Sequence, residues 1–334
     1  VRIIGTATDE NMASYTLEYV LGTGKPVNIA TVNGGKTVES AELGKWDLSG
    51  LATESYTIRL TAVDKNKNQS VVEVNVVLEK FKLLNTIVDD LSHSKNLGVD
   101  SMGNVYVYAA DVKSDSIKKI NILTSKVMGS IGKGILSNPE WVFVDAANNL
   151  YVTNHNGDSV IKLDSSGKQL LKIDAKTFRR ANSLTVDGAE NIYVVDRDAD
   201  MVYKFDSTGK KVSSLGGKKL LNNPQGIAVA SNGDILVVSQ NNDEVVEFDQ
   251  TGRVVNSIGK GVLSNPFDVK IDKNGTIYVS DTILREVAMF SRNGTLLQEF
   301  KGGAGKSAFR STGGIEVTQD GKLYVMDILS SKIY

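Results

Sequence analysis

The sequence predicts an all-β protein, with a β-sandwich over residues 1–80 and a closed ring of repeated four-stranded units over residues 81–334. Three observations support this fold class. The chain has 31 glycines but only four prolines, and many Asn-Gly and Asp-Gly pairs, which is typical of short strands joined by tight turns. Short stretches alternate apolar and polar residues, which is the period of a strand. In the second region one phrase returns again and again, which indicates a repeat architecture.

The region of residues 1–80 contains three stretches with strand periodicity and many β-branched or aromatic residues: "SYTLEYV", "SYTIRLTAVDKNKNQ" and "VVEVNVVLE". We expect Trp46, in "LGKWDLSGL", to anchor the core of this sandwich. No flexible linker separates these strands from the repeats, so the joint is predicted to be short.

The repeats can be aligned on one aromatic or apolar anchor in the second strand of each unit, at intervals of 42 to 46 residues. The anchors are Tyr106, Tyr151, Tyr193, Leu236, Tyr278 and Tyr324. A tight turn precedes each anchor, and a third and a fourth strand follow in most units. Four short strands in about 42 residues match a blade of a β-propeller. The sequence therefore predicts six blades, with the anchors packed between neighbouring sheets.

The last unit ends partway through its third strand, at Ile333 and Tyr334. The stretch "FKLLNTIV", residues 81–88, resembles a fourth strand without a unit of its own. We expect it to complete the last blade, because closing the ring removes exposed sheet edges.

The recurring phrases N-P-x-x-(I/V)-x-(V/I)-D and (N/G)-x-(L/I)-Y-V-x-(D/N) resemble those of the NHL-repeat family of six-bladed propellers, over residues 81–334. The first blade departs from the pattern, because it lacks the Asn-Pro. Residues 1–80 resemble bacterial immunoglobulin-like modules, through W-D-x-x-x-L at Trp46 and Y-T-x-R-L-x-A-x-D-x-x-x-N from Tyr56. Such modules occur on large exported and cell-surface proteins. The resemblance implies a bacterial extracellular or cell-surface location.

Composition excludes several classes of function. The formal net charge is -1, so no overall attraction to nucleic acid or membrane is expected. The chain has no cysteine, which excludes disulfides, thiol nucleophiles and cysteine-based zinc sites. No apolar run approaches the roughly 20 residues of a membrane span.

Function is expected in the loops that enter the blades, because residues that repeat serve packing. These loops are rich in basic residues, and a basic face would bind an anionic polymer or polysaccharide through phosphate or carboxylate groups. The candidate ligand-binding residues are Arg179, Arg180, Lys218, Lys219, Lys301, Lys306 and Arg310. Acidic residues in nearby loops would cancel part of the positive potential of this face. Few aromatic residues lie between the basic ones to stack on bases, so nucleic acid is the less favoured ligand.

A second candidate surface is apolar. Ile283, Leu284, Ile328 and Leu329 stand where other blades carry polar residues. We expect either a patch for a protein partner or local packing of the loops.

Catalysis is the alternative. The NHL resemblance includes a lyase that cuts peptidyl hydroxyglycine with several histidines around a metal, but this chain has only two histidines. No catalytic or metal-binding motif is present, so no resident metal or other cofactor is predicted, although paired loop carboxylates remain an alternative. Calcium is a further candidate at Asp9 and Asp64, whose oxygens would suit it, but both are also ordinary turn residues.

The sequence thus favours a non-catalytic binding or scaffolding module of a larger bacterial exported or surface protein. It would present one propeller face to a protein or an anionic polymer. Two alternatives stay open: a lyase or hydrolase that uses loop carboxylates on the same face, and a purely structural unit of a surface assembly.

Overall fold

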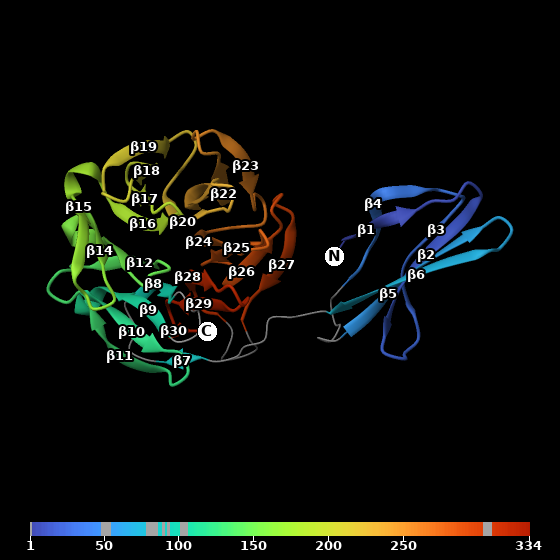
Figure 1. The fold of residues 1–334 in the computed structure, drawn as a ribbon, viewed down its shortest axis with the longest axis horizontal. Coiled ribbons are helices and arrows are strands. Elements are labelled where there is room, and N and C mark those ends of the chain that lie inside the picture. Colours follow the sequence, from blue (N-terminus) through green and yellow to red (C-terminus); the bar gives the residue numbers. More distant parts are fainter. Residues whose placement is uncertain are drawn as a thin grey trace. The chain divides into compact units, whose positions relative to one another are not determined.

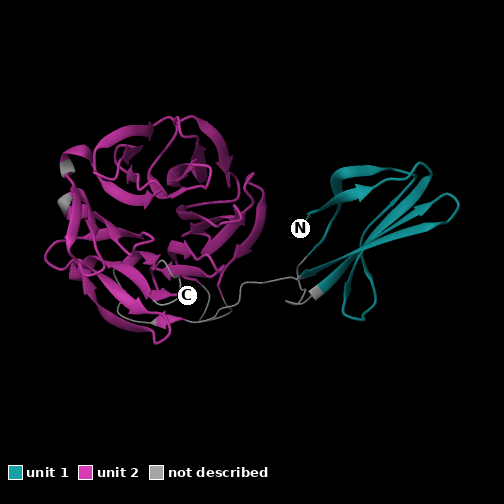
Figure 2. Cartoon of the chain, in the orientation of Figure 1, with its two compact units in different colours: residues 1–82 teal, residues 83–334 magenta. Residues whose placement is uncertain are grey.

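The computed structural model describes residues 2–47, 55–77, 86–88, 91, 94–100, 106–302 and 309–334. The chain divides into two compact units, Val1–Lys82 and Leu83–Tyr334 (Figure 2). Within the described residues, strands account for nearly all regular structure. Helical structure is limited to four single 3-10 turns, η1 (Val112–Ser114), η2 (His155–Gly157), η3 (Ala175–Thr177) and η4 (Gln240–Asn242).

Unit 1 consists of two antiparallel sheets around one core. The larger sheet has the order β3-β2-β5-β6 and the smaller one pairs β1 with β4. Their bounds are β1 (Arg2–Ala7), β2 (Met12–Leu21), β3 (Val27–Asn33), β4 (Val38–Lys45), β5 (Ser55–Asp64) and β6 (Gln69–Val77). Trp46 is buried and packs edge-on against Tyr56, with ring centroids 5.5 Å apart, so it anchors this core as predicted.

Unit 2 contains six four-stranded antiparallel sheets in its described part. Five of them follow chain order from the inner to the outer strand. They are β8 (Ser94–Val99), β9 (Tyr106–Asp111), β10 (Ser116–Asn121), β11 (Lys126–Ile131); β12 (Pro139–Val144), β13 (Leu150–Asn154), β14 (Ser159–Leu163), β15 (Gln169–Ile173); β16 (Ala181–Val186), β17 (Ile192–Asp196), β18 (Met201–Phe205), β19 (Lys211–Gly216); β20 (Pro224–Val229), β21 (Ile235–Ser239), β22 (Glu244–Phe248), β23 (Val254–Ile258); and β24 (Pro266–Ile271), β25 (Ile277–Asp281), β26 (Glu286–Phe290), β27 (Leu296–Phe300).

The sixth sheet joins the two ends of unit 2. Its order is β28 (Thr312–Val317), β29 (Leu323–Asp327), β30 (Lys332–Ile333) and β7 (Ile87–Val88). The described end of the 81–88 stretch is therefore the fourth strand of the last sheet, while residues 81–85 lie outside the described part. Each inner strand contacts the inner strands of the two adjacent sheets, and β28 contacts β8, so the sheets form a closed ring (Figure 1). The fold is all-β and consistent with a β-propeller.

The repeated residues serve packing and turn formation, as expected. The anchors from Tyr151 to Tyr324 are buried between sheets, whereas Tyr106 is half-buried. An aspartate that ends the second strand binds the loop entering its own blade. Asp281, which is fully buried, accepts hydrogen bonds from the backbone N–H groups of Ser264, Asn265, Ile283 and Leu284. Asp196 and Asp327 hold their loops in the same way.

Replacing Asp281 with alanine is predicted to lower the free energy of unfolding of unit 2 by about 3 kcal/mol, because several buried N–H donors lose their acceptor. Denaturant unfolding followed by circular dichroism measures the change. Asp206→Ala is the matched control, since Asp206 accepts similar hydrogen bonds in an exposed hairpin turn and its loss should matter much less. Equal effects of the two substitutions would contradict the structural role of the buried aspartate.

Candidate functional site

The candidate site lies at the start of the six inner strands. In every one of them the regular pairing breaks between the first residue and the third or fourth. Such a β-bulge re-aims the side chain at the irregular position. The second residue of each inner strand lies at this break, and we call these six residues the mouth ring: Lys95, Glu140, Asn182, Gln225, Phe267 and Gly313.

Glu140 is the acidic member of the mouth ring and is only 8% exposed. Its Oε1 lies 3.4 Å from Nη2 of Arg180 and 3.7 Å from Nζ of Lys95. The three residues come from three consecutive sheets, so they meet only because the ring brings the inner strands together. A carboxylate at this position can exchange a proton with a bound molecule.

The loops on either side hold this group in place. Asp196 accepts hydrogen bonds from the backbone N–H groups of Arg179 and Arg180, at 2.7 and 3.0 Å. The loop before Glu140 is held at Asn138, whose N–H donates to Asp115 from the preceding sheet at 2.6 Å. The arginine and the glutamate are therefore positioned by backbone contacts and not only by each other.

A chain of side-chain amides continues the polar surface around the ring. Asn182 donates to Gln225 at 3.1 Å, and Gln225 donates to Gln240 at 3.3 Å. Gln240 in turn donates to Asn265 at 3.2 Å. Amide side chains both donate and accept hydrogen bonds, so this arc suits a ligand with hydroxyl, amide or carbonyl groups.

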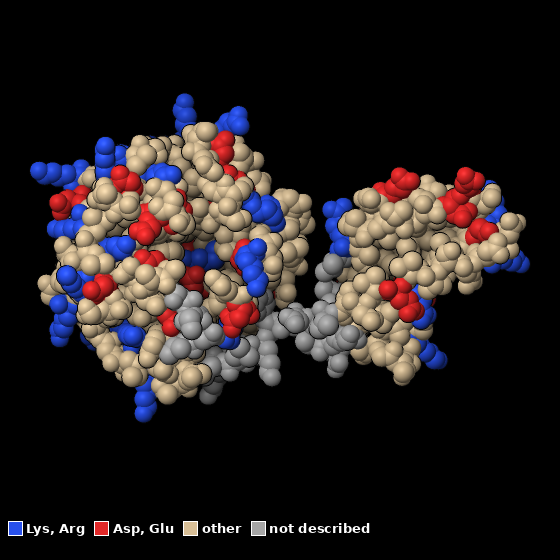
Figure 3. All heavy atoms as spheres, in the orientation of Figure 1, with Lys and Arg blue, Asp and Glu red and all other residues tan. Residues whose placement is uncertain are grey.

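Aromatic rings form the floor beneath the polar residues. Trp141 and Phe267 stack with centroids 6.0 Å apart, although their strands belong to sheets on opposite sides of the ring. The contact therefore crosses the axis. Glycines let adjacent inner strands approach closely at the same level: a Cβ on Gly226 would lie 2.5 Å from Asp268, and one on Gly314 would lie 2.7 Å from Asn96. Basic and acidic atoms line the hollow at the centre of unit 2 in Figure 3.

Buried charges lie on the inner strands beyond this floor. Nζ of Lys270 lies 3.2 Å from Oε2 of Glu316. Asp268 is fully buried and links two sheets, because its Oδ2 accepts the N–H of Ile315 at 3.0 Å. Burial raises the pKa of Asp268 to about 6, while the charge of Lys270 acts in the opposite direction.

Three buried N–H donors beside the mouth ring have no hydrogen-bond partner within the described residues. They are Nδ2 of Asn96, Nε1 of Trp141 and Nε of Arg180. Buried donors are rarely left unpaired, so these atoms are available to a bound molecule or to water.

The donor set of the mouth ring does not fit a metal ion. The described residues contain no group of three or more His, Asp or Glu side chains that could hold one. The ring itself contributes a single carboxylate, that of Glu140. The cations beside it, Lys95 and Arg180, would repel a metal ion. Asp9 and Asp64, the calcium candidates, accept hydrogen bonds in their own turns, and calcium binding there stays a prediction.

The basic residues singled out in the sequence do not form one surface of free charges. Arg180 turns inward to Glu140, and Lys301 lies 3.2 Å from the buried Glu286. The remaining described ones, Arg179, Lys218, Lys219 and Arg310, are exposed, and Lys306 lies outside the described residues. Ligand binding by these basic residues stays a prediction.

The four apolar candidates differ in their exposure to solvent. Ile283 and Leu329 are 61% and 63% exposed. Leu284 and Ile328 are half-buried, and Ile328 packs against a core cluster. A protein partner for this patch stays a prediction. No helix in the described part of the chain is long and apolar enough to cross a membrane.

Sequence reasoning missed the mouth ring. A signal was present, because the residue after the repeated Asn-Pro changes from Glu140 to Gln225 to Phe267. It was overlooked because the loops entering the blades were searched for basic residues.

The comparisons place the fold among known structures. No family model matches the chain, and no curated protein matches it. A streptogramin B lyase structure aligns with 84% of this chain and 88% of its own, at 15% identity and a TM-score of 0.57. The virginiamycin B lyase of Staphylococcus aureus aligns with 84% of this chain and 90% of its own, at 12% identity and a TM-score of 0.56. A gluconolactonase from Xanthomonas campestris aligns with 74% of this chain and 86% of its own, at 16% identity and a TM-score of 0.59.

These neighbours correct the main prediction from the sequence. At such identities the likeness shows the fold only, but the three structures named above are those of enzymes. The prediction of a non-catalytic binding or scaffolding module is contradicted by them, and the enzyme alternative is favoured. The physical reason for the error is that the contact of Glu140 with Lys95 and Arg180 joins different sheets, so it depends on ring closure and is not visible in the sequence.

The raised pKa of Asp268 predicts a pH-dependent stability. The folded state favours the protonated carboxyl of Asp268. The contribution of this carboxyl to the free energy of unfolding is therefore fully present below about pH 3.8 and is lost as the pH rises through about 6. Asp268→Asn cannot titrate but keeps an acceptor for Ile315. We expect the free energy of unfolding of the wild type, relative to this variant, to fall by about 3 kcal/mol between pH 3.8 and 7. A difference independent of pH would contradict this assignment.

Proposed function

We propose that the chain is an enzyme, a lyase or hydrolase, whose active site is the mouth ring and whose catalytic acid–base is Glu140. The observation that carries the proposal is the contact of the buried Glu140 with Arg180 and Lys95, at a strand position whose residue changes from blade to blade. The enzymes of the same fold support it.

Glu140 would act by moving a proton. In a hydrolase its carboxylate takes the proton of a water that attacks the substrate carbonyl. In a lyase it takes a proton from the carbon next to the carbonyl, while the bond to the leaving group breaks. In both cases negative charge develops on the carbonyl oxygen. Arg180 and Lys95 would stabilise that charge, with the unpaired N–H of Trp141 or Asn96 as further donors.

The surroundings suggest the class of substrate. The arc from Asn182 to Asn265 would bind hydroxyl or amide groups, and the rings of Trp141 and Phe267 would contact an apolar face. A gluconolactonase, by its name, acts on a lactone. We therefore propose a small polar ester or lactone.

We also propose the finer assignment of the fold and its setting. Six four-stranded sheets and the recurring Asn-Pro phrases support a six-bladed propeller of the NHL type. The two sheets around Trp46 support an immunoglobulin-like unit 1, and with it a bacterial exported or cell-surface location.

Glu140→Gln is predicted to lower kcat by at least about 100-fold on any lactone or ester that the wild type cleaves, because the amide cannot accept the proton. Turnover is measured on a panel of sugar lactones, simple esters and cyclic peptide esters, with circular dichroism to check the fold.

Glu190→Gln is the control, since Glu190 lies in a turn at the other end of the inner strands and forms only a half-exposed ion pair. It should leave kcat unchanged. Full activity in the Glu140→Gln variant would exclude Glu140 as the acid–base and with it this active site.

A further inference from the structure

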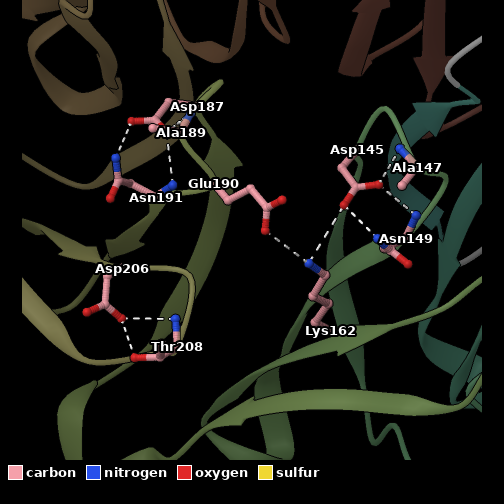
Figure 4. Close-up of polar contacts among 10 residues, drawn as sticks. All are labelled: Asp145, Ala147, Asn149, Lys162, Asp187, Ala189, Glu190, Asn191, Asp206 and Thr208. Carbon is pink, nitrogen blue, oxygen red and sulfur yellow. Dashed lines mark hydrogen bonds and ion pairs between the residues drawn. The ribbon is translucent and has the colours of Figure 1, made fainter.

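The turns between the first and second strands lie at the opposite end of the inner strands from the mouth ring. Between the sheets of β12 and β16, a cation closes the gap at this end. Nζ of Lys162 lies 3.9 Å from Oδ2 of Asp145 in its own sheet and 3.7 Å from Oε2 of Glu190 in the next (Figure 4). The ion pair therefore joins the two sheets.

The gap between the sheets of β20 and β24 is closed in a similar way with the charges reversed. Glu247 takes the place of Lys162, and Arg292 of the next sheet contacts both Glu247 and Asp234. The Arg292–Asp234 distance is 3.2 Å. Charge pairing across adjacent sheets is thus a recurring feature of this face.

The gap between the sheets of β16 and β20 departs from this pattern. Lys204 stands where Lys162 stands, because each pairs with the anchor tyrosine of its sheet. The residue of the next sheet that corresponds to Glu190 is Gly233, and Ala230 stands where Asp145 and Asp187 begin the turns of the two preceding sheets. Gln250 replaces Arg292. The next sheet therefore offers Lys204 no carboxylate at these positions.

The aspartate of its own sheet does not compensate. The carboxylate of Asp187 accepts hydrogen bonds from Ala189 N and from Asn191 N and Nδ2 (Figure 4). It also accepts one from the hydroxyl of Tyr193, at 3.1 Å. Lys204 forms no ion pair with a described residue. Its Nζ lies 5.0 Å from the ring centroid of Tyr193.

A groove lies at this position. Its volume is about 590 Å³, and Lys204, Tyr193, Ser231, Gly233 and Gln250 are among the residues that line it. A space of this size accommodates a small organic molecule. The groove therefore combines room for a ligand with a half-buried cation that lacks the cross-sheet carboxylate of its counterpart Lys162.

We propose that this groove is a binding site for a small organic carboxylate, which takes the place that the Glu190 side chain occupies beside Lys162. The site is separate from the mouth ring and does not depend on the proposed catalytic function. Propionate is the natural probe, because it reproduces the end of a glutamate side chain.

The test is a titration of the full chain with sodium propionate, followed by amide NMR, with sodium chloride at equal ionic strength as the reference. We expect saturable shifts of the Ser231 and Gly233 amides, with a dissociation constant of about 1 mM or below. Lys204→Met should weaken binding at least tenfold. Lys162→Met is the matched control, and it should leave propionate binding within twofold of the wild type.

A second variant fills the site from within. Gly233→Glu together with Gln250→Ala supplies an internal carboxylate and removes the side chain that a Cβ at Gly233 would meet. Gly233 has a φ of 84°, in the left-handed region that Glu190, with a φ of 61°, also adopts. This variant should no longer respond to propionate. Unchanged binding in it or in Lys204→Met, or no saturable shifts at Ser231 and Gly233 in the wild type, would overturn the proposal.

Discussion

The break in strand pairing at the start of every inner strand is the constraint on which the candidate site depends. Further along each strand, the pairing is regular and apolar residues such as Val142 and Leu184 fill the space between sheets. At the bulge a side chain is freed from that packing, so residues as different as Glu140, Gln225 and Phe267 are tolerated without loss of the fold. The buried aspartates, such as Asp281, hold the loops that lead into the bulges. The ring can therefore keep its architecture while the chemistry at its mouth varies.

In this fold, the candidate functional residues lie where one blade differs from the repeated pattern. Glu140 is an acid at a position where other blades carry a lysine, amides, an aromatic ring or glycine. Gly233 is neutral where the preceding blade carries Glu190, and Ala230 is neutral where the two preceding blades carry Asp145 and Asp187. Each departure changes the charge at one end of the ring and leaves the core untouched. The physical reason is that side chains at strand ends and turns contact few core atoms, so substitutions there cost little stability.

The two ends of the ring use charge differently. At the mouth, the carboxylate of Glu140 is buried against two cations, and unpaired N–H donors surround it. This arrangement favours stabilising a developing negative charge close to a proton acceptor. At the opposite end, ion pairs such as that of Lys162 are balanced and join neighbouring sheets. Only the gap at Lys204 lacks such a pair among those compared, which is why we assign a ligand to it.

The sequence by itself determined the all-β class, the anchors that pack between sheets and the Trp46 core. These follow from periodicity and turn chemistry, which act over a few residues and are repeated many times. The contact of Glu140 with Lys95 and Arg180 joins residues about 40 positions apart in neighbouring sheets, and the stacking of Trp141 on Phe267 joins opposite sides of the ring. Only the closed tertiary structure decides such contacts, because ring closure and bulge geometry set which strand starts face one another.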